Sequence, residues 1–287
     1  MIIVSGGTSY VGRELVAMLR LAGLPFKVLT RDRTKTRENL GRDVSCVSGD
    51  MNKPATLKAA FGGADRLFLI AQSGPSYVAH IREAVHIARL SGINHIVMMS
   101  GPDILLPAEV KSQLGNQCWE AEEELIRSGT DYTILRPTYF MQNVLIDQSD
   151  LVKSKRLMRG AILPNAPIAM VDARDVAGVA YAALAYGGHR GKTYSLTGTP
   201  TTYQHVAMAL SEALQQSVRY DQIKAGKGNK TTLRGKPTKW HLNLERDWAN
   251  VFAAGGGDFT TSSIVELTGY QPRTIEEFIN DHITLFT

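Results

Sequence analysis

Val4-Ser-Gly-Gly-Thr-Ser-Tyr-Val-Gly12 is the most informative stretch of this 287-residue sequence. It follows an apolar run that predicts a strand over residues 2–5, and it opens an amphipathic pattern that predicts a helix over residues 12–22. Glycines at such a turn let the backbone approach a pyrophosphate, and the helix N-terminus attracts its negative charge. The stretch therefore predicts a dinucleotide site, against the plainer alternative of a tight strand–helix turn.

The residues of this turn have separate expected roles. Gly6 is expected to form the turn, and Gly12 to let the helix pack closely on the strand. Ser9 stands where the pattern usually has its middle glycine, but its small hydroxyl side chain can reach a phosphate. The other expected cofactor contacts of the turn are Thr8, Tyr10 and Val11.

Short apolar runs alternate with helical patterns through the first half of the chain. Such alternation is typical of right-handed strand–helix–strand units and a parallel sheet. The expected strands are residues 2–5, 26–30, 44–48, 66–70, 95–100, 132–135 and 192–196, and the clearest helices are residues 12–22, 77–91 and 116–127. The predicted fold class is α/β: a Rossmann doubly wound parallel sheet with a smaller, discontinuous α+β C-terminal substrate domain.

The pattern loosens after Pro137, and residues 138–166 are expected to be irregular. A helix is expected after Val171, with Asp175 as its N-cap. Further helices are expected over residues 202–215 and as two short segments within 262–286. We expect an NADP-binding Rossmann domain of residues 1–137 plus about 170–198, and a substrate-binding domain of about 138–166 plus 199–287.

The end of the second predicted strand bears on the choice of cofactor. An acidic residue there holds the ribose 2′-hydroxyl of NAD, and a basic one holds the 2′-phosphate of NADP. Thr30 occupies the acidic position and Arg31 follows it, while Arg33 and Lys35 add positive charge. Asp32 is the counter-evidence, because a shift of one residue would bring it to the ribose. The sequence favours NADP(H) over NAD(H).

Further cofactor contacts are expected at the carboxyl ends of the following strands, where open α/β sheets place their ligands. Asp50 ends the third strand, and its carboxylate could accept from an adenine amino group or cap the helix expected near Pro54. The remaining candidates are Ile70, Ala71, Gln72, Ser100 and Pro137.

Composition narrows the class of protein. The chain is 44% hydrophobic without an 18-residue apolar run, so no membrane span is expected. Its two cysteines, the absence of a leader pattern and of metal-ligand spacings predict a cytoplasmic protein without a metal site. Part of its net charge of +5 falls in the glycine-rich stretch 224–239, which lacks the interleaved aromatics of a nucleic-acid site. The expected partner is a small-molecule substrate, and a homodimer is compatible with the sequence.

Four stretches carry a family resemblance that covers almost the whole chain: Gly6-Gly-Thr-Ser-Tyr-Val-Gly12, Ser128-Gly-Thr-Asp-Tyr-Thr-Ile-Leu-Arg-Pro-Thr-Tyr-Phe-Met-Gln-Asn143, Met170-Val-Asp-Ala-Arg-Asp-Val-Ala177 and Leu267-Thr-Gly-Tyr-Gln-Pro-Arg-Thr-Ile-Glu-Glu-Phe278. The chain resembles the NmrA-like group of atypical short-chain dehydrogenases/reductases. That group includes quinone reductases, imine reductases and catalytically silent redox sensors, so the resemblance implies an NAD(P)H-binding reductase or sensor.

Typical members of this superfamily carry a Tyr-x-x-x-Lys pair, in which the tyrosine donates a proton. Aligning Glu122 with the glutamate that follows the pair puts Leu114 at the tyrosine position and Cys118 at the lysine position. Neither residue can do that work. We therefore predict a reductase that transfers hydride to an electrophilic quinone, enone, imine or ketone, with a non-catalytic NADP(H)-binding redox sensor as the alternative.

The substrate pocket is expected after the sixth strand, at the carboxyl end of the sheet. Thr138, Tyr139 and Phe140 leave that strand, and Tyr139 is the candidate substrate contact, as a stacking wall or a hydrogen-bond donor. Trp119 and Trp248 are expected to complete an aromatic pocket, although aromatic side chains of this kind also serve simply as core. No catalytic acid is assigned.

Overall fold

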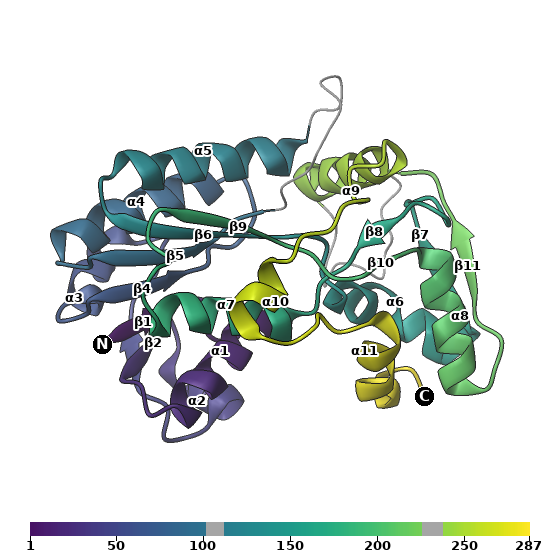
Figure 1. The fold of residues 1–287 in the computed structure, drawn as a ribbon, viewed down its shortest axis with the longest axis horizontal. Helices are drawn as coiled ribbons and strands as arrows, with labels where there is room; N and C mark the ends of the chain where they lie inside the picture. Colours follow the sequence, from purple (N-terminus) through teal and green to yellow (C-terminus); the bar gives the residue numbers. More distant parts are fainter. Residues whose placement is uncertain (102–111, 226–237) are drawn as a thin grey trace.

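A computed structural model describes residues 1–101, 112–225 and 238–287. Its centre is a seven-stranded parallel sheet in the order β3-β2-β1-β4-β5-β6-β9 (Figure 1). The strands are β1 (Ile2–Val4), β2 (Phe26–Thr30), β3 (Cys46–Ser48), β4 (Arg66–Leu69), β5 (His95–Met99), β6 (Asp131–Pro137) and β9 (Lys192–Leu196). This is the predicted doubly wound sheet, and its strand order reverses between β1 and β4, where such folds bind ligands.

Helices cover both faces of the sheet because its strands are apolar on both sides. One face carries α1 (Tyr10–Leu21), α7 (Ala173–Ala185) and α10 (Ser263–Thr268), and the other carries α3 (Leu57–Phe61), α4 (Tyr77–Leu90) and α5 (Gln113–Arg127). Neighbouring strand residues alternate between the two cores: Ile3 packs under α3 and α4, and Val4 packs under α1 and α7. The helix α2 (Arg33–Leu40) lies beside β3, and the single turn η1 (Pro54–Thr56) lies against α3 and α4.

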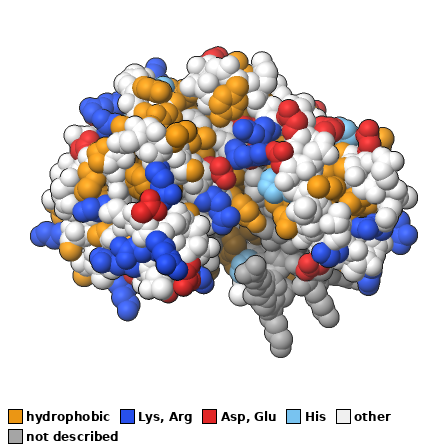
Figure 2. Space-filling model, turned by 90° about the horizontal axis from the view of Figure 1, so that it is seen from below, with side chains coloured by type: hydrophobic (Ala, Val, Ile, Leu, Met, Phe, Trp, Pro, Cys, Tyr) orange, Lys and Arg blue, Asp and Glu red, His pale blue; other side chains and the backbone are white. Residues whose placement is uncertain are grey.

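A smaller α+β unit lies beyond the carboxyl ends of the strands (Figure 1). Its helices are α6 (Gln142–Lys155), α8 (Tyr203–Leu214), α9 (Lys239–Ala253), α11 (Ile275–Asp281) and the turn η2 (Ile283–Leu285). Two small sheets pair β8 (Ile168–Ala169) with β10 (Pro200–Thr201) and β7 (Leu157–Gly160) with β11 (Arg219–Gln222). These elements share a third hydrophobic core, built by separated segments of the chain. Figure 2 shows the surface hollowed between the two parts, with hydrophobic side chains in the hollow.

Two sequence expectations were wrong here. Residues 138–166 contain the long helix α6 and the strand β7 rather than irregular chain. The helix escaped notice because it buries polar side chains: the Gln148 amide bonds the backbone N–H and carbonyl of Arg159, and Gln142 contacts Asp172. The N-cap of α7 is Asp172 and not Asp175, which lies within the first turn of the helix. The domain boundaries themselves stay a prediction. The helix α10 belongs by sequence to the expected substrate-binding domain, but it packs on α7 against the central sheet.

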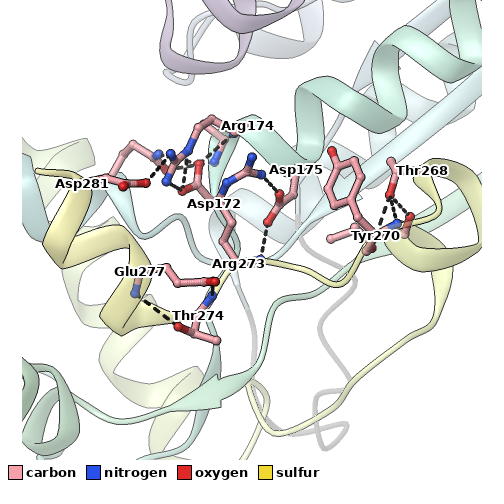
Figure 3. Close-up of polar contacts among 12 residues, drawn as sticks. Asp172, Arg174, Asp175, Thr268, Tyr270, Arg273, Thr274, Glu277 and Asp281 are labelled. Carbon is pink, nitrogen blue, oxygen red and sulfur yellow. Dashed lines mark hydrogen bonds and ion pairs between the residues drawn. The ribbon is translucent and has the colours of Figure 1, made fainter.

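The first turn of α7 ties the C-terminal segment to the sheet (Figure 3). Asp172 and Asp175 are fully buried, and each is paired with an arginine. Arg174 contacts Asp172 at 2.7 Å and Asp281 of α11 at 2.6 Å. Asp175 pairs with the Arg273 guanidinium and also accepts a 2.9 Å hydrogen bond from the Arg273 backbone N–H. The contacts fix α11 and the chain before it against the Rossmann part.

Within the described segments, no helix combines the length and the apolar character that crossing a bilayer requires. Most of the basic stretch 224–239 lies outside the described residues, so the structure does not test the argument against a nucleic-acid site there.

Candidate active site

The first cavity, of about 210 Å³, opens at the carboxyl ends of β1, β2 and β3. Six of the predicted cofactor contacts line it: Gly6, Thr8, Arg31, Asp50, Ile70 and Gln72. Ser9, Tyr10, Val11 and Gly12 are not among the lining residues. Val11 and Gly12 are buried against the sheet, and the Tyr10 ring lies partly exposed beside Arg13.

The glycine turn leaves no room for side chains at its glycine positions. Gly6 has a φ of +61°, a conformation that favours glycine. A Cβ on Gly7 would lie 2.6 Å from Val28 Cγ1, and one on Gly12 would collide with the Gly6 carbonyl oxygen. The Ser9 hydroxyl accepts from Gly12 N–H at 3.0 Å and so caps α1. The bare backbone and the capped helix N-terminus fit the pyrophosphate of a bound NAD(P)H.

At the ribose end of this cavity the lining includes Thr30, Arg31 and Thr36. The Asp32 carboxylate accepts from the Lys35 backbone N–H at 3.0 Å and caps α2, and it is absent from the lining. Arg31 therefore contributes a cation here without a competing carboxylate from Asp32. A cation at this position suits a ribose 2′-phosphate.

Asp50 also faces this cavity. Its carboxylate accepts from the Asn52 backbone N–H at 3.0 Å and from the Asn52 side chain at 3.2 Å, and the first of these bonds is the main cause of a lowered Asp50 pKa. The helical turn η1 is capped by Lys53 without a side-chain bond, so the N-cap alternative for Asp50 was wrong. Its contact with adenine stays a prediction.

A second cavity, of about 230 Å³, opens at the carboxyl ends of β4, β5 and β6. Seven predicted residues line it: three that were expected to contact the cofactor, Ala71, Ser100 and Pro137, and four that were expected in the substrate pocket, Thr138, Tyr139, Phe140 and Trp248. Trp119 does not belong to it, because its side chain is 61% exposed on the outer face of α5 while its neighbour Cys118 faces inward. The Thr138 hydroxyl donates to backbone carbonyls of Ala169 and Leu196, which leaves it a structural role.

The two cavities meet along the segment that follows β4. Ile70 and Gln72 line the first cavity, and the alternate residues Ala71 and Ser73 line the second. A single extended backbone separates the two spaces, since successive side chains point to opposite sides. A dinucleotide that binds its pyrophosphate at Gly6 can therefore extend past this segment toward the second cavity.

Aromatic rings form one wall of the second cavity. The Tyr139 ring meets Trp248 edge-on at 5.4 Å between centroids, and Trp248 stacks on Phe252 at 5.1 Å. The Tyr139 hydroxyl lies 3.3 Å from the Tyr203 hydroxyl, inside the core of the second unit. Burial raises the pKa of Tyr139. Of its two expected roles, the geometry favours the stacking wall over the hydrogen-bond donor.

A second wall is polar, and the sequence did not predict all of it. Ser100 donates to the buried Glu122 carboxylate at 2.5 Å, and Arg136 pairs with the same carboxylate. Tyr77, at the start of α4, and Cys118 complete this wall. Burial raises the pKa of Tyr77, and it raises the pKa of Cys118 to about 11. Nothing in the sequence marks Tyr77, because a tyrosine in an amphipathic helix predicts core packing.

In the described part of the chain, no three His, Cys, Asp or Glu side chains form a group that could hold an ion. His80 instead lies 3.1 Å from the Asn52 side chain, at the edge of the first cavity.

Residues 6–186 match the NAD(P)H-binding family. Over its full length the chain is 33% identical to the NAD(P)H azoreductase of Xenophilus azovorans, 99% of which it covers. Its structure is similar to that of the NADPH-dependent quinone oxidoreductase QOR2 of Escherichia coli in complex with NADPH (TM-score 0.83, 24% identity, 99% of this chain and 100% of that chain). NmrA, a negative transcriptional regulator in complex with NAD, is also similar (TM-score 0.76, 17% identity, 98% and 94%).

The chain belongs to the NAD(P)H-binding family. It is an NAD(P)H-dependent oxidoreductase.

Proposed function

We propose that the chain uses NADPH to reduce a planar, electrophilic double bond, such as that of a quinone, enone, imine, ketone or azo compound. The observation that carries this proposal is the pair of cavities on either side of the segment 70–73. One has the glycine turn and a cation for a dinucleotide, and the other has an aromatic wall for a flat acceptor. The azoreductase and quinone oxidoreductase relatives act on acceptors of this shape.

The residues at the tyrosine and lysine positions of the superfamily both line the second cavity. They are Leu114 and Cys118, and a thiol with a pKa of about 11 carries neither a fixed positive charge nor a proton that it readily gives up. Bound NADPH supplies the hydride. The protein therefore contributes mainly position: Tyr139 and Trp248 hold the acceptor plane, and the surrounding core excludes water.

The experiment that tests the proposal mixes the purified protein and NADPH with a panel of quinones, enones, imines, ketones and azo dyes, and follows the nicotinamide absorbance. We expect turnover with at least one class and faster turnover with NADPH than with NADH. The alternative is a redox sensor. A panel without turnover, together with clearly different affinities for NADP⁺ and NADPH, would reject the reductase and support the sensor.

A further inference from the structure

We propose that the Tyr77 hydroxyl is the hydrogen-bond donor to the acceptor's reacting oxygen or nitrogen, from α4, in place of the tyrosine that α5 lacks. This inference rests on the proposed function above. It names the residue that recognises the electron-rich atom formed when a neutral double bond takes up hydride.

Tyr77 lies at the place where the missing group would act. Leu114 and Cys118 point from α5 into the second cavity, and Tyr77 enters the same cavity from the first turn of α4, which packs against α5. The Tyr77 side chain is only 3% exposed, and it shares the cavity lining with Ser100 and Cys118. The donor has thus moved from one helix to its neighbour while the cavity stays the same.

Counting hydrogens shows that the Tyr77 hydroxyl is available to an acceptor. Ser100 has a single hydroxyl hydrogen, and it is donated to Glu122. The Glu122 carboxylate is held in place by Arg136, through contacts of 2.5 to 3.2 Å. Ser100 therefore has no second hydroxyl hydrogen to donate to Tyr77. When an acceptor enters, the Tyr77 hydrogen can turn to it.

The chemical step balances with NADPH as the hydride donor and water as the proton source. The acceptor takes a hydride, with its electron pair, at one atom of the double bond, and NADPH becomes NADP⁺. The π electrons move to the partner oxygen or nitrogen, where negative charge develops and accepts the Tyr77 hydrogen bond. A proton from water then neutralises this atom. Burial keeps the Tyr77 hydroxyl protonated because it raises the pKa, so a donor is present throughout the neutral pH range.

The test compares two kinds of acceptor in Tyr77→Phe. A neutral quinone or azo dye develops negative charge, whereas a quaternised cyclic iminium ion becomes a neutral amine and needs no donor. We expect kcat with the quinone to fall about a hundredfold, as on loss of one oxyanion donor. The Kd for NADPH and the rate with the iminium ion should change by less than threefold.

Tyr132→Phe is the matched control, since Tyr132 on β6 packs against the same hydrophobic core outside the cavity. A 3-fluorotyrosine at position 77 keeps the shape and strengthens the donor, so it should retain or raise the quinone rate. A quinone rate that falls less than threefold in Tyr77→Phe overturns the proposal, as does an equal fall with both kinds of acceptor. Absence of turnover in the unmutated protein would instead reject the proposed function.

Discussion

At the scale of single residues, we expect Arg31 to determine the affinity of the dinucleotide cavity for the ribose 2′-phosphate. It lines the cavity, while Asp32 is held in the cap of α2 by the Lys35 N–H. We expect Arg31→Ala to weaken NADPH binding by about 1.5–3 kcal/mol, the contribution of a hydrogen bond to a charged group, and to leave NADH binding unchanged. Calorimetry with both cofactors measures this, with Arg33→Ala outside the lining as the control. Equal affinities for NADPH and NADH in the unmutated protein would contradict it.

His95 makes stability depend on pH. It is buried, and burial and the nearby Arg190 and Arg66 lower its pKa to about 4. The unfolded chain takes up a proton near pH 6.5, whereas the folded chain does not until about pH 4, so stability falls as the pH is lowered through this window. Over the whole of this pH window, this one group should lower the free energy of unfolding by about 3 kcal/mol.

Urea unfolding at pH 7 and pH 4.5 measures this effect. His95→Gln keeps a donor for the Thr133 hydroxyl, 2.9 Å from His95 Nε2, but cannot titrate, so its stability should fall less between the two pH values than that of the unmutated protein. His86→Gln, at an exposed position on α4, should show the unmutated difference. A His95→Gln variant with the unmutated pH dependence would show that other groups account for it.

Single residues also show where sequence reasoning stops. The roles of Gly6 and Gly12 follow from local backbone geometry, which a nine-residue stretch contains in full. Tyr77, Ser100 and Glu122 come from three separate elements, and only the packing of α4 on α5 brings them together. The prediction that Trp119 lines the pocket was wrong for a related reason. One step along a helix, from Cys118 to Trp119, turns the side chain by about 100°, from the cavity to the solvent.

At the scale of elements, the first turn of α7 carries two fully buried carboxylates, and each depends on an arginine. Removing one partner of a buried pair leaves an uncompensated charge, so Arg273→Ala should destabilise the protein by about 3 kcal/mol. Arg190→Ala is the control: its pair with Asp131 is half exposed on both sides and should contribute at most about 1 kcal/mol. Denaturant unfolding compares the two, and equal losses would contradict the structural role of Asp175.

The strands of the sheet were predictable because short continuous apolar runs indicate burial on both faces of a sheet. The sequence places five strands within about one residue of their observed ends. The α6 helix was not predictable from the sequence. Its buried Gln142 and Gln148 form hydrogen bonds with Asp172 and Arg159, which are distant in sequence. A polar residue inside a core cannot be told from a surface residue until its partner is known.

At the scale of the whole molecule, only the second of the two cavities takes lining residues from the second unit, so cofactor binding and acceptor binding should be separable. Trp248 lies on α9 in the second unit and lines only the acceptor cavity. Trp248→Ala should raise KM for the acceptor at least tenfold by removing the surface on which the plane rests, and leave the Kd for NADPH within twofold. Trp119→Ala removes an indole of the same size from the exposed face of α5 and should change neither. Steady-state kinetics and cofactor titration of both variants test the separation. If Trp248→Ala weakened NADPH binding as strongly as it raised KM, the second unit would be shaping the cofactor site itself, and the assignment of one cavity to each ligand would be wrong.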